Sequence, residues 1–135
     1  MNVATEKFEM PITVDNSHID QLGHVNNTVY LKWVQEAATA HWMARTTDAE
    51  KQPWYWVVTR HEIDYKYPAF LGEVLKAVTW VGKAKELRYE RFTEIRRVKD
   101  DALLARARTE WCPIDTQTFR PRAVSEAVRE KFSTG

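Results

Sequence analysis

A polar turn around Gly23 leads directly into the longest helical pattern of the chain. After this glycine, apolar and aromatic residues recur at spacings of three and four positions, which places them on one face of an α-helix. The residues on this face are Val25, Val29, Trp33, Val34, Ala37, His41 and Trp42. The pattern predicts a helix that starts near Asn26, a favoured N-cap residue, and ends before a polar surface loop at 46–53.

Five further segments have the composition of β-strands, and most of them alternate with a period of two. They are residues 8–14, 54–67, 73–81, 87–99 and 103–112, the last ended by Pro113. The segment 87–99 mixes aromatic and charged residues, so the pattern does not assign its buried face. Gly82 and the charged residues 83–86 are expected to form the turn before it. One long helix with five antiparallel strands predicts an α+β fold in which the sheet wraps the apolar face of the helix.

Composition limits the class of protein. A chain of 135 residues, 44% hydrophobic and 29% charged, is expected to form one globular domain over 1–135. The net charge of +1 gives no reason to expect nucleic acid or an anionic membrane as partner, and no apolar run is long enough to span a bilayer. The lone Cys112 excludes an intrachain disulfide and suits a cytoplasmic protein.

The turn itself carries the motif Asp20-x-x-Gly23-His24-Val25-Asn26-Asn27-x-x-Tyr30. Together with the strand layout over nearly the whole chain, it resembles the hot-dog-fold acyl-CoA thioesterases, the 4-hydroxybenzoyl-CoA thioesterase family and its relatives. The resemblance implies a five-stranded antiparallel sheet around one central helix, with a short C-terminal helix. It implies hydrolysis of a fatty or aromatic acyl-CoA without a cofactor, since coenzyme A is part of the substrate. It also implies a homodimer or homotetramer with active sites at a subunit interface, and pairing of sheet edges would form such a dimer.

Asp20 is the residue that we interpret as the catalytic carboxylate. Thioester hydrolysis needs a nucleophile or an activated water, and a group that stabilises the oxyanion. The first turn of the helix offers unpaired backbone N–H groups for the second task. The resemblance points to the N–H of Asn27 first and of Asn26 next. His24 either contacts the thioester carbonyl or is a capping or buried histidine, and Asp20 in turn has the alternative of a simple turn residue.

The resemblance also assigns residues to substrate binding. Basic residues in two regions correspond to positions that meet the nucleotide and pantetheine parts of coenzyme A: the turn between the third and fourth strands, and the segment around Pro121. Gly23 and Tyr30 are motif positions with the same assignment. The assigned basic residues are Lys83, Lys85, Arg120 and Arg122. Lysine and arginine neutralise phosphates, although solvated surface charge is the alternative interpretation for each of them.

Other interpretations are less well supported by the sequence. Close relatives often carry an acid at the position of Gln35, so we expect the neighbouring Glu36 to be solvated or paired rather than catalytic. No metal site is expected, because His18, Asp20 and His24 lack a second cluster that would complete a ligand set. An acyl-carrier-protein thioesterase is an alternative, although those enzymes carry asparagine at the position of Leu22. A non-catalytic acyl-CoA-binding module is the alternative outside enzymes.

Overall fold

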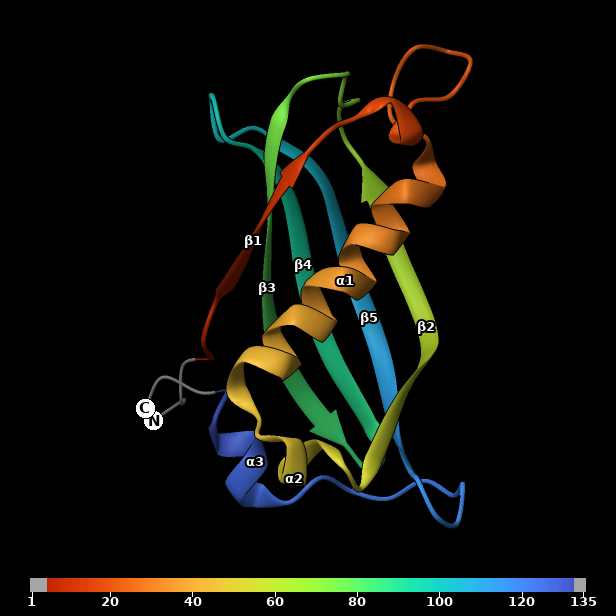
Figure 1. Cartoon of the computed structure of the whole chain (residues 1–135), viewed down its shortest axis with the longest axis vertical. Helices are drawn as coiled ribbons and strands as arrows, with labels where there is room; N and C mark the ends of the chain where they lie inside the picture. Colours follow the sequence, from red (N-terminus) through yellow and green to blue (C-terminus); the bar gives the residue numbers. More distant parts are fainter. Residues whose placement is uncertain (1–4, 133–135) are drawn as a thin grey trace.

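The computed structural model describes residues 5–132; the outermost residues of the predicted domain lie outside this range. One long helix, α1, crosses one face of a sheet whose strands run along the longest axis of the molecule (Figure 1). The strands are β1 (Phe8–Thr13), β2 (Trp54–Tyr65), β3 (Val74–Lys85), β4 (Arg88–Arg97) and β5 (Leu103–Asp115). The helices are η1 (Asn16–His18), α1 (Asn27–Arg45), α2 (Asp48–Lys51) and α3 (Glu126–Glu130).

The sheet is antiparallel in every pairing, in the order β1-β3-β4-β5-β2. Hairpins connect β3, β4 and β5 in sequence, while β1 and β2 lie at the two edges. The segment that contains α1 therefore connects one edge strand to the other and must cross the sheet on the way. This arrangement confirms the predicted α+β hot-dog architecture, in which five strands wrap one helix and a short helix follows near the C-terminus.

The apolar face of α1 and the inner face of the sheet form the core. The helix buries Tyr30, Trp33, Val34, Ala37, Ala38 and His41. From the sheet, Leu75, Ile95 and Leu104 are at most 1% exposed and belong to the same cluster as Trp33. Small residues such as Ala77 on β3 and Ala105 on β5 let the helix lie close to the strands.

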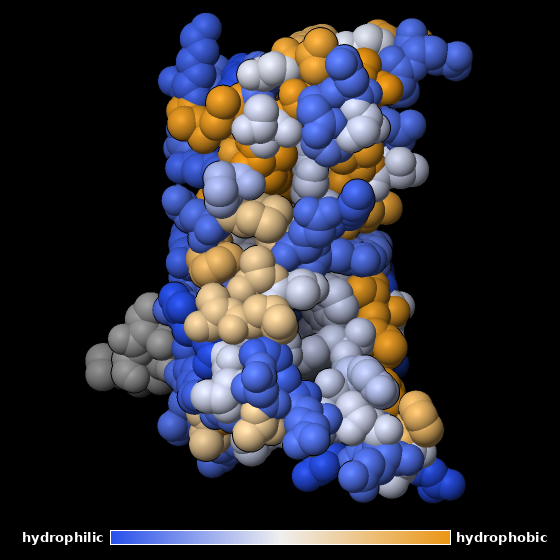
Figure 2. All heavy atoms as spheres, in the orientation of Figure 1, coloured by the Kyte–Doolittle hydropathy of each residue, from blue (hydrophilic) through white to orange (hydrophobic). Residues whose placement is uncertain are grey.

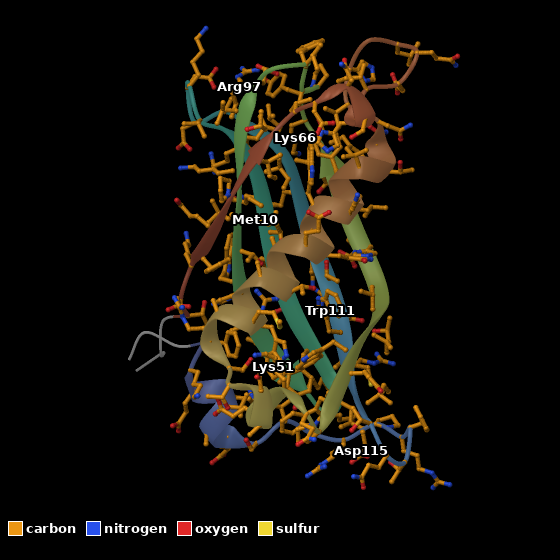
Figure 3. All side chains as sticks on the ribbon, viewed as in Figure 1. Met10, Lys51, Lys66, Arg97, Trp111 and Asp115 are labelled. Carbon is orange, nitrogen blue, oxygen red and sulfur yellow. The ribbon has the colours of Figure 1, made fainter. Side chains whose placement is uncertain are left out.

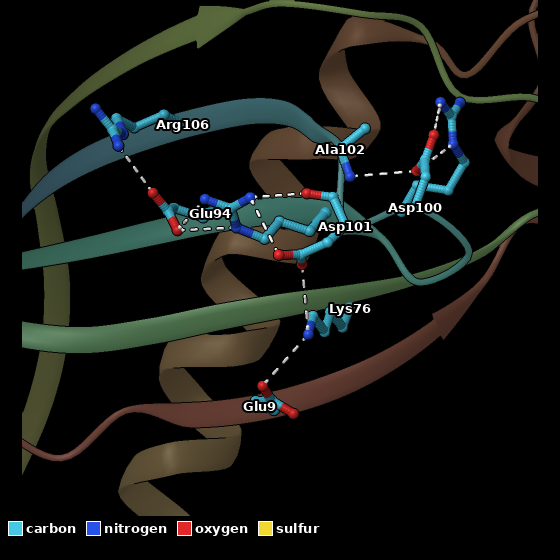
Figure 4. Close-up of polar contacts among 9 residues, drawn as sticks. Glu9, Lys76, Glu94, Asp100, Asp101, Ala102 and Arg106 are labelled. Atoms are coloured by element: carbon cyan, nitrogen blue, oxygen red, sulfur yellow. Dashed lines mark hydrogen bonds and ion pairs between the residues drawn. The ribbon is translucent and has the colours of Figure 1, made fainter.

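Charged side chains cover the opposite face of the sheet (Figure 4). The ammonium group of Lys76 lies 3.7 Å from the carboxylate of Glu9 and 3.6 Å from that of Asp101, so it links neighbouring elements across the sheet. Glu94 likewise accepts from Arg106 at 2.9 Å and from Arg96 at 3.1 Å. The pairs of Lys76 are partly exposed and contribute little stability one by one, whereas Glu94 is only 7% exposed and depends on its two arginines.

Three local expectations are corrected by the structure. The loop at 46–53 contains the one-turn helix α2, whose capping box of Thr47 and Glu50 is a recognisable signal in the sequence. Strand β3 continues through a bulge after Val81 to Lys85, so the turn to β4 falls at residues 86–87, where Glu86 has a φ of 58°. A second bulge between Val58 and Arg60 breaks the alternation predicted for β2.

Candidate active site

Residues 18–26 form a tight loop that a short antiparallel ladder closes. The N–H of Asp20 donates to the C=O of His24 at 3.1 Å, and the N–H of Asn26 donates to the C=O of His18 at 3.0 Å. Between these bonds, Ile19 pairs with Val25. The ladder holds Asp20 beside the segment that leads into Asn26, at the beginning of α1. Five of the predicted site residues, Asp20, Gly23, His24, Asn26 and Asn27, therefore lie together.

The first backbone amides of α1 differ in whether they have a partner. Asn26 is the N-cap, as predicted, because its side-chain oxygen accepts from the N–H of Thr28 at 2.9 Å. Its own N–H is occupied by His18. The N–H of Asn27 makes no hydrogen bond within residues 5–132. Of the two amides that the sequence suggests, the one at Asn27 is available to a ligand.

The carboxylate of Asp20 has one engaged oxygen and one available oxygen. Its Oδ1 accepts from the N–H of Leu22 at 2.8 Å, which is the contact of a turn residue. Its Oδ2 makes no hydrogen bond among the described residues, and the side chain is half-buried. His24 is half-buried and its Nδ1 lies 3.3 Å from the C=O of Val25. Asp20 can therefore be a turn residue through Oδ1 and still offer Oδ2 for catalysis.

Tyr30 and Tyr65 hold the loop in place. The hydroxyl of Tyr30, a residue only 2% exposed, accepts from the N–H of Ala69, and the C=O of Ala69 accepts from the N–H of Val25 at 2.9 Å. The hydroxyl of Tyr65 on β2 donates to the C=O of Asn27 at 3.0 Å. In the single chain Tyr30 thus anchors the loop, and its contribution to substrate binding stays a prediction.

The basic residues assigned to coenzyme A lie at the other end of the molecule. Lys83 and Lys85 lie in β3 rather than in the turn after it. Arg120 is exposed, and Arg122 donates to Asp115 at 2.9 Å. Asp115 is labelled in Figure 3 at the opposite end from Arg97 and Lys66. The 19 residues of α1 extend for roughly 28 Å, so one chain alone does not bring these basic residues to Asp20.

The helix carboxylate does not join the loop. Glu36 is exposed, and its carboxylate lies 3.9 Å from the ammonium group of Lys32. Gln35 instead donates to the Nε2 of His61 on β2 at 3.3 Å. His61 also contacts the hydroxyl of Thr109 at 3.3 Å. This arrangement agrees with the expectation that Glu36 is a solvated, paired residue.

Replacing Gly23 by alanine is expected to lower the free energy of unfolding by about 1–2 kcal/mol, because its φ is +84°. An added Cβ would meet no atom within 4 Å, so the cost comes from the backbone alone. Gly72 is a matched control, since its φ is +83° and its Cβ would also meet nothing within 4 Å. Urea unfolding should give equal losses for the two variants, whereas only Gly23→Ala should lower turnover. Equal turnover of the two variants would show that the loop around Gly23 does not contribute to catalysis.

Most of the chain matches a known protein family. Residues 14–132 match the family model of the Thioesterase-like superfamily. The chain belongs to this superfamily. As a member, it is a thioester hydrolase, as its sequence predicts.

Three solved structures illustrate the relationship of this thioesterase-like chain. A DHNA-CoA thioesterase from Staphylococcus aureus is 27% identical, with a TM-score of 0.76 over 86% of this chain and 79% of the other. A predicted thioesterase from Bacillus stearothermophilus is 24% identical, with a TM-score of 0.83 over 94% of both chains. A thioesterase from Thermus thermophilus, complexed with coenzyme A and Zn, is 23% identical, with a TM-score of 0.78 over 92% of this chain and 90% of the other. A search of curated proteins finds no match.

Residues 5–132 lack two features that would indicate another kind of site. This part of the thioesterase-like chain contains no group of three or more His, Cys, Asp or Glu side chains placed to hold a metal ion. Nor does it contain a helix with the length and apolar character needed to cross a membrane. The absence of a metal or cofactor stays a prediction.

Proposed function

We propose that this enzyme hydrolyses an acyl-CoA thioester at the loop formed by residues 18–26. The observation that carries the proposal is that one loop and the helix start that follows it contain two groups without a hydrogen-bond partner among residues 5–132: the Oδ2 of Asp20 and the N–H of Asn27. A carboxylate and an amide donor are the two groups that thioester hydrolysis requires. The likeness of the fold to a DHNA-CoA thioesterase and to a thioesterase with bound coenzyme A supports the choice of coenzyme A.

The reaction follows from these two groups. The thioester carbonyl oxygen accepts from the N–H of Asn27, where the positive end of the α1 dipole stabilises the developing oxyanion. Acting as a base, Oδ2 of Asp20 removes a proton from water as the water oxygen bonds to the acyl carbon. The C–S bond then breaks, the acid is released, and the coenzyme A sulfur takes the proton. Acting as a nucleophile, the same oxygen would bond to the acyl carbon and displace the coenzyme A thiolate as the C–S bond breaks, leaving a mixed anhydride. Water would then open the anhydride to the free acid and the Asp20 carboxylate, and a proton from that water would go to the coenzyme A sulfur.

The active enzyme is proposed to be a dimer formed by edge-to-edge pairing of β2. This strand is a 12-residue sheet edge, and its exposed side chains include Tyr55 (53%) and Val57 (43%). Figure 2 shows hydrophobic atoms along the margin where β2 runs. The first half of this edge is largely apolar, whereas Arg60, Glu62 and Asp64 are exposed in the second half. An unpaired edge offers free backbone groups for pairing, and a twofold axis would make the pairing antiparallel. The Tyr65 end of β2, where Tyr65 contacts Asn27, would then lie beside the Trp54 end of the partner.

Such pairing would bring together predicted site residues that lie far apart in a single chain. Arg120 and Arg122 follow the end of β5, whose residue Asp115 pairs with Trp54 in the sheet. In the proposed dimer these arginines would therefore approach Asp20 of the other subunit. There they can contact the phosphates of coenzyme A while its thioester reaches Asp20. Association of two such dimers into a tetramer remains a further prediction.

Mixing two inactive variants tests this arrangement. One variant carries Asp20→Asn, and the other carries Arg120→Ala with Arg122→Ala. Random subunit exchange is expected to restore about a quarter of the wild-type rate at low substrate concentration, because half of the dimers would be mixed and each would hold one intact site. The Arg88→Ala variant is the control for loss of an exposed cation. If mixed dimers are verified by mass and the hydrolysis rate still does not recover, the arginines would act with Asp20 of their own chain, and the proposed arrangement would be wrong.

A substrate screen tests the chemical class. Rates on matched aliphatic and aromatic CoA esters, and on the same acyl groups carried by acyl carrier protein, should favour the CoA esters. Higher kcat/KM on the carrier-protein esters would support the carrier-protein enzyme instead. Tight binding of CoA esters without turnover across the panel would support a binding module.

A further inference from the structure

A second feature of the molecule is a cavity of about 1090 Å³ at the C-terminal half of α1. It lies between α1, the inner face of the sheet and α3, and its lining combines aromatic and charged side chains. The aromatic residues are Trp42, Trp54, Tyr55, Trp56, Tyr89, Trp111 and Phe132. Figure 3 labels Trp111 and Lys51 in this half of the molecule, whereas Asp20 precedes the other end of the helix. The volume suits a small organic ligand, and apolar pockets with a few polar groups are typical of such sites.

The cavity has one buried cation in its wall. Arg91 on β4 is only 7% exposed, and it lines the cavity. Its Nη1 donates to the hydroxyl of Thr79 at 3.1 Å and to the Nδ1 of His41 at 3.0 Å. Within residues 5–132, no hydrogen bond satisfies its Nε or Nη2, and no carboxylate lies within 4 Å. A buried charge without a partner is costly, so a site of this kind favours an anion.

The charges near Arg91 do not supply that anion. Glu6 accepts from Nε2 of His41 at 2.7 Å, but it also pairs directly with Arg45 at 2.7 Å. One negative charge is therefore shared between two arginines, and Arg91 is the one without direct contact. Glu90, which also lines the cavity, is bound to Arg108 at 2.6 Å. The two other carboxylates in the lining belong to exposed residues of α3.

The unoccupied edge of Arg91 has the geometry that carboxylates prefer. A guanidinium binds a carboxylate in bidentate fashion through two parallel N–H groups. Elsewhere in this chain, Arg97 does so through the same two atoms, Nε to Oδ1 of Asp100 at 3.0 Å and Nη2 to Oδ2 at 2.8 Å. The corresponding atoms of Arg91 are the ones without a partner in the described part of the chain. The predicted ligand group is therefore a carboxylate.

The rest of the lining indicates the body of the ligand. The rings of Trp42 and Trp56 pack edge to face with their centroids 5.4 Å apart, and the rings of Trp56 and Tyr89 do so at 5.3 Å. Such rings pack well against another aromatic ring. The indole N–H groups of Trp54, Trp56 and Trp111 are buried without an acceptor among residues 5–132. Because these N–H groups have almost no accessible surface, the tryptophans offer a ligand their ring surfaces rather than free donors.

We propose that this cavity is a second ligand site, which binds an aromatic carboxylate with its carboxylate on the Nε–Nη2 edge of Arg91 and its ring among the tryptophans. The site does not use Asp20 of its own chain, which precedes the opposite end of α1, although the proposed dimer would bring the partner's loop to the Trp54 end of the cavity, which Lys83 also lines.

Calorimetric titration of the full-length protein with 2-naphthoate and with the neutral 2-naphthamide tests the site. Wild-type protein should bind the acid roughly tenfold to a hundredfold more tightly than the amide, as expected for hydrogen bonds to a charged group. Arg91→Gln should remove this preference. Arg88→Gln, on the exposed side of the same strand, and Asp20→Asn should both retain it. Equal affinities of the wild type for acid and amide, or an unchanged preference in folded Arg91→Gln, would overturn the proposal.

A measurement on the wild type keeps the test independent of whether Arg91→Gln folds. In a spectrum of arginine side-chain N–H groups, one buried Nε–H signal should shift on addition of 2-naphthoate and stay in place with 2-naphthamide. The same titration should perturb tryptophan side-chain signals from the cavity. Binding of the acid that leaves every buried arginine and tryptophan signal unchanged would place it elsewhere on the molecule and reject the site.

Discussion

The Asp20→Asn variant should lose turnover by about 10²- to 10⁴-fold while its affinity for CoA esters stays close to that of the wild type. Asparagine preserves the contact with the N–H of Leu22 through its side-chain oxygen, so the loop should keep its shape. What the variant lacks is the second, unpaired carboxylate oxygen that removes a proton or attacks the acyl carbon. Because binding depends on other groups, the loss should appear in kcat rather than in KM.

Glu36→Gln is the matched control for this experiment. Glu36 is also an acid in the region of the motif, but its side chain is exposed and faces Lys32. If Glu36 were the catalytic carboxylate, Glu36→Gln would lose turnover and Asp20→Asn would retain it. Single-turnover rates with one CoA ester, together with the dissociation constant of a non-hydrolysable analogue, separate the two assignments. Hydrolysis by Asp20→Asn within a few-fold of the wild type would reject the mechanism.

The fold could be predicted because its strongest signals are local. The three- and four-residue spacing after Gly23 identifies the helix, and Asn26 marks its beginning in both the pattern and the structure. The face of β4 could not be assigned, because Tyr89, Arg91, Thr93 and Ile95 alternate inward although one of them is charged. Binary patterning assumes that arginine is exposed, so it fails where tertiary contacts bury one.

The loop was predictable for the same reason, whereas the position of the basic residues assigned to coenzyme A was not. Asp20 and Asn27 are close in sequence, so a turn suffices to bring them together. Arg120 and Arg122 belong to the far end of the molecule, where only a second subunit would bring them to the loop. Likewise, the cavity at Arg91 combines residues from α1, β2, β4, β5 and α3, a set that no spacing in the sequence reveals.

The network around Arg91 also makes the protein sensitive to acid. His41 is fully buried between Phe8, stacked at 5.0 Å, and Phe132, edge-on at 4.8 Å. Burial, and next the charge of Arg91, lower the pKa of His41 from 6.5 to about 4. The neutral ring donates from Nε2 to Glu6 and accepts at Nδ1 from Arg91. A second proton would have to enter at Nδ1, facing the guanidinium.

This shift fixes the sign of the pH dependence. Below pH 6.5 the unfolded chain binds a proton at His41, while the folded protein does so only near pH 4. The free energy of unfolding should therefore fall as the pH falls through this window, by about 3 kcal/mol in total and by about 2 kcal/mol between pH 7 and pH 5. Denaturant titrations of the wild type at these two pH values measure this contribution together with that of His61, whose pKa is also lowered by burial.

His41→Gln identifies the source of this dependence. Glutamine can donate to Glu6 and accept from Arg91, but it does not titrate. Whatever stability the variant loses at pH 7, its change between pH 7 and pH 5 should be smaller than that of the wild type by about 2 kcal/mol. Most carboxylates remain ionised over this range, so they contribute little to the difference. Parallel curves for the two proteins would mean that His41 takes up its proton equally in the folded and unfolded states, contrary to its position between Arg91 and two aromatic rings.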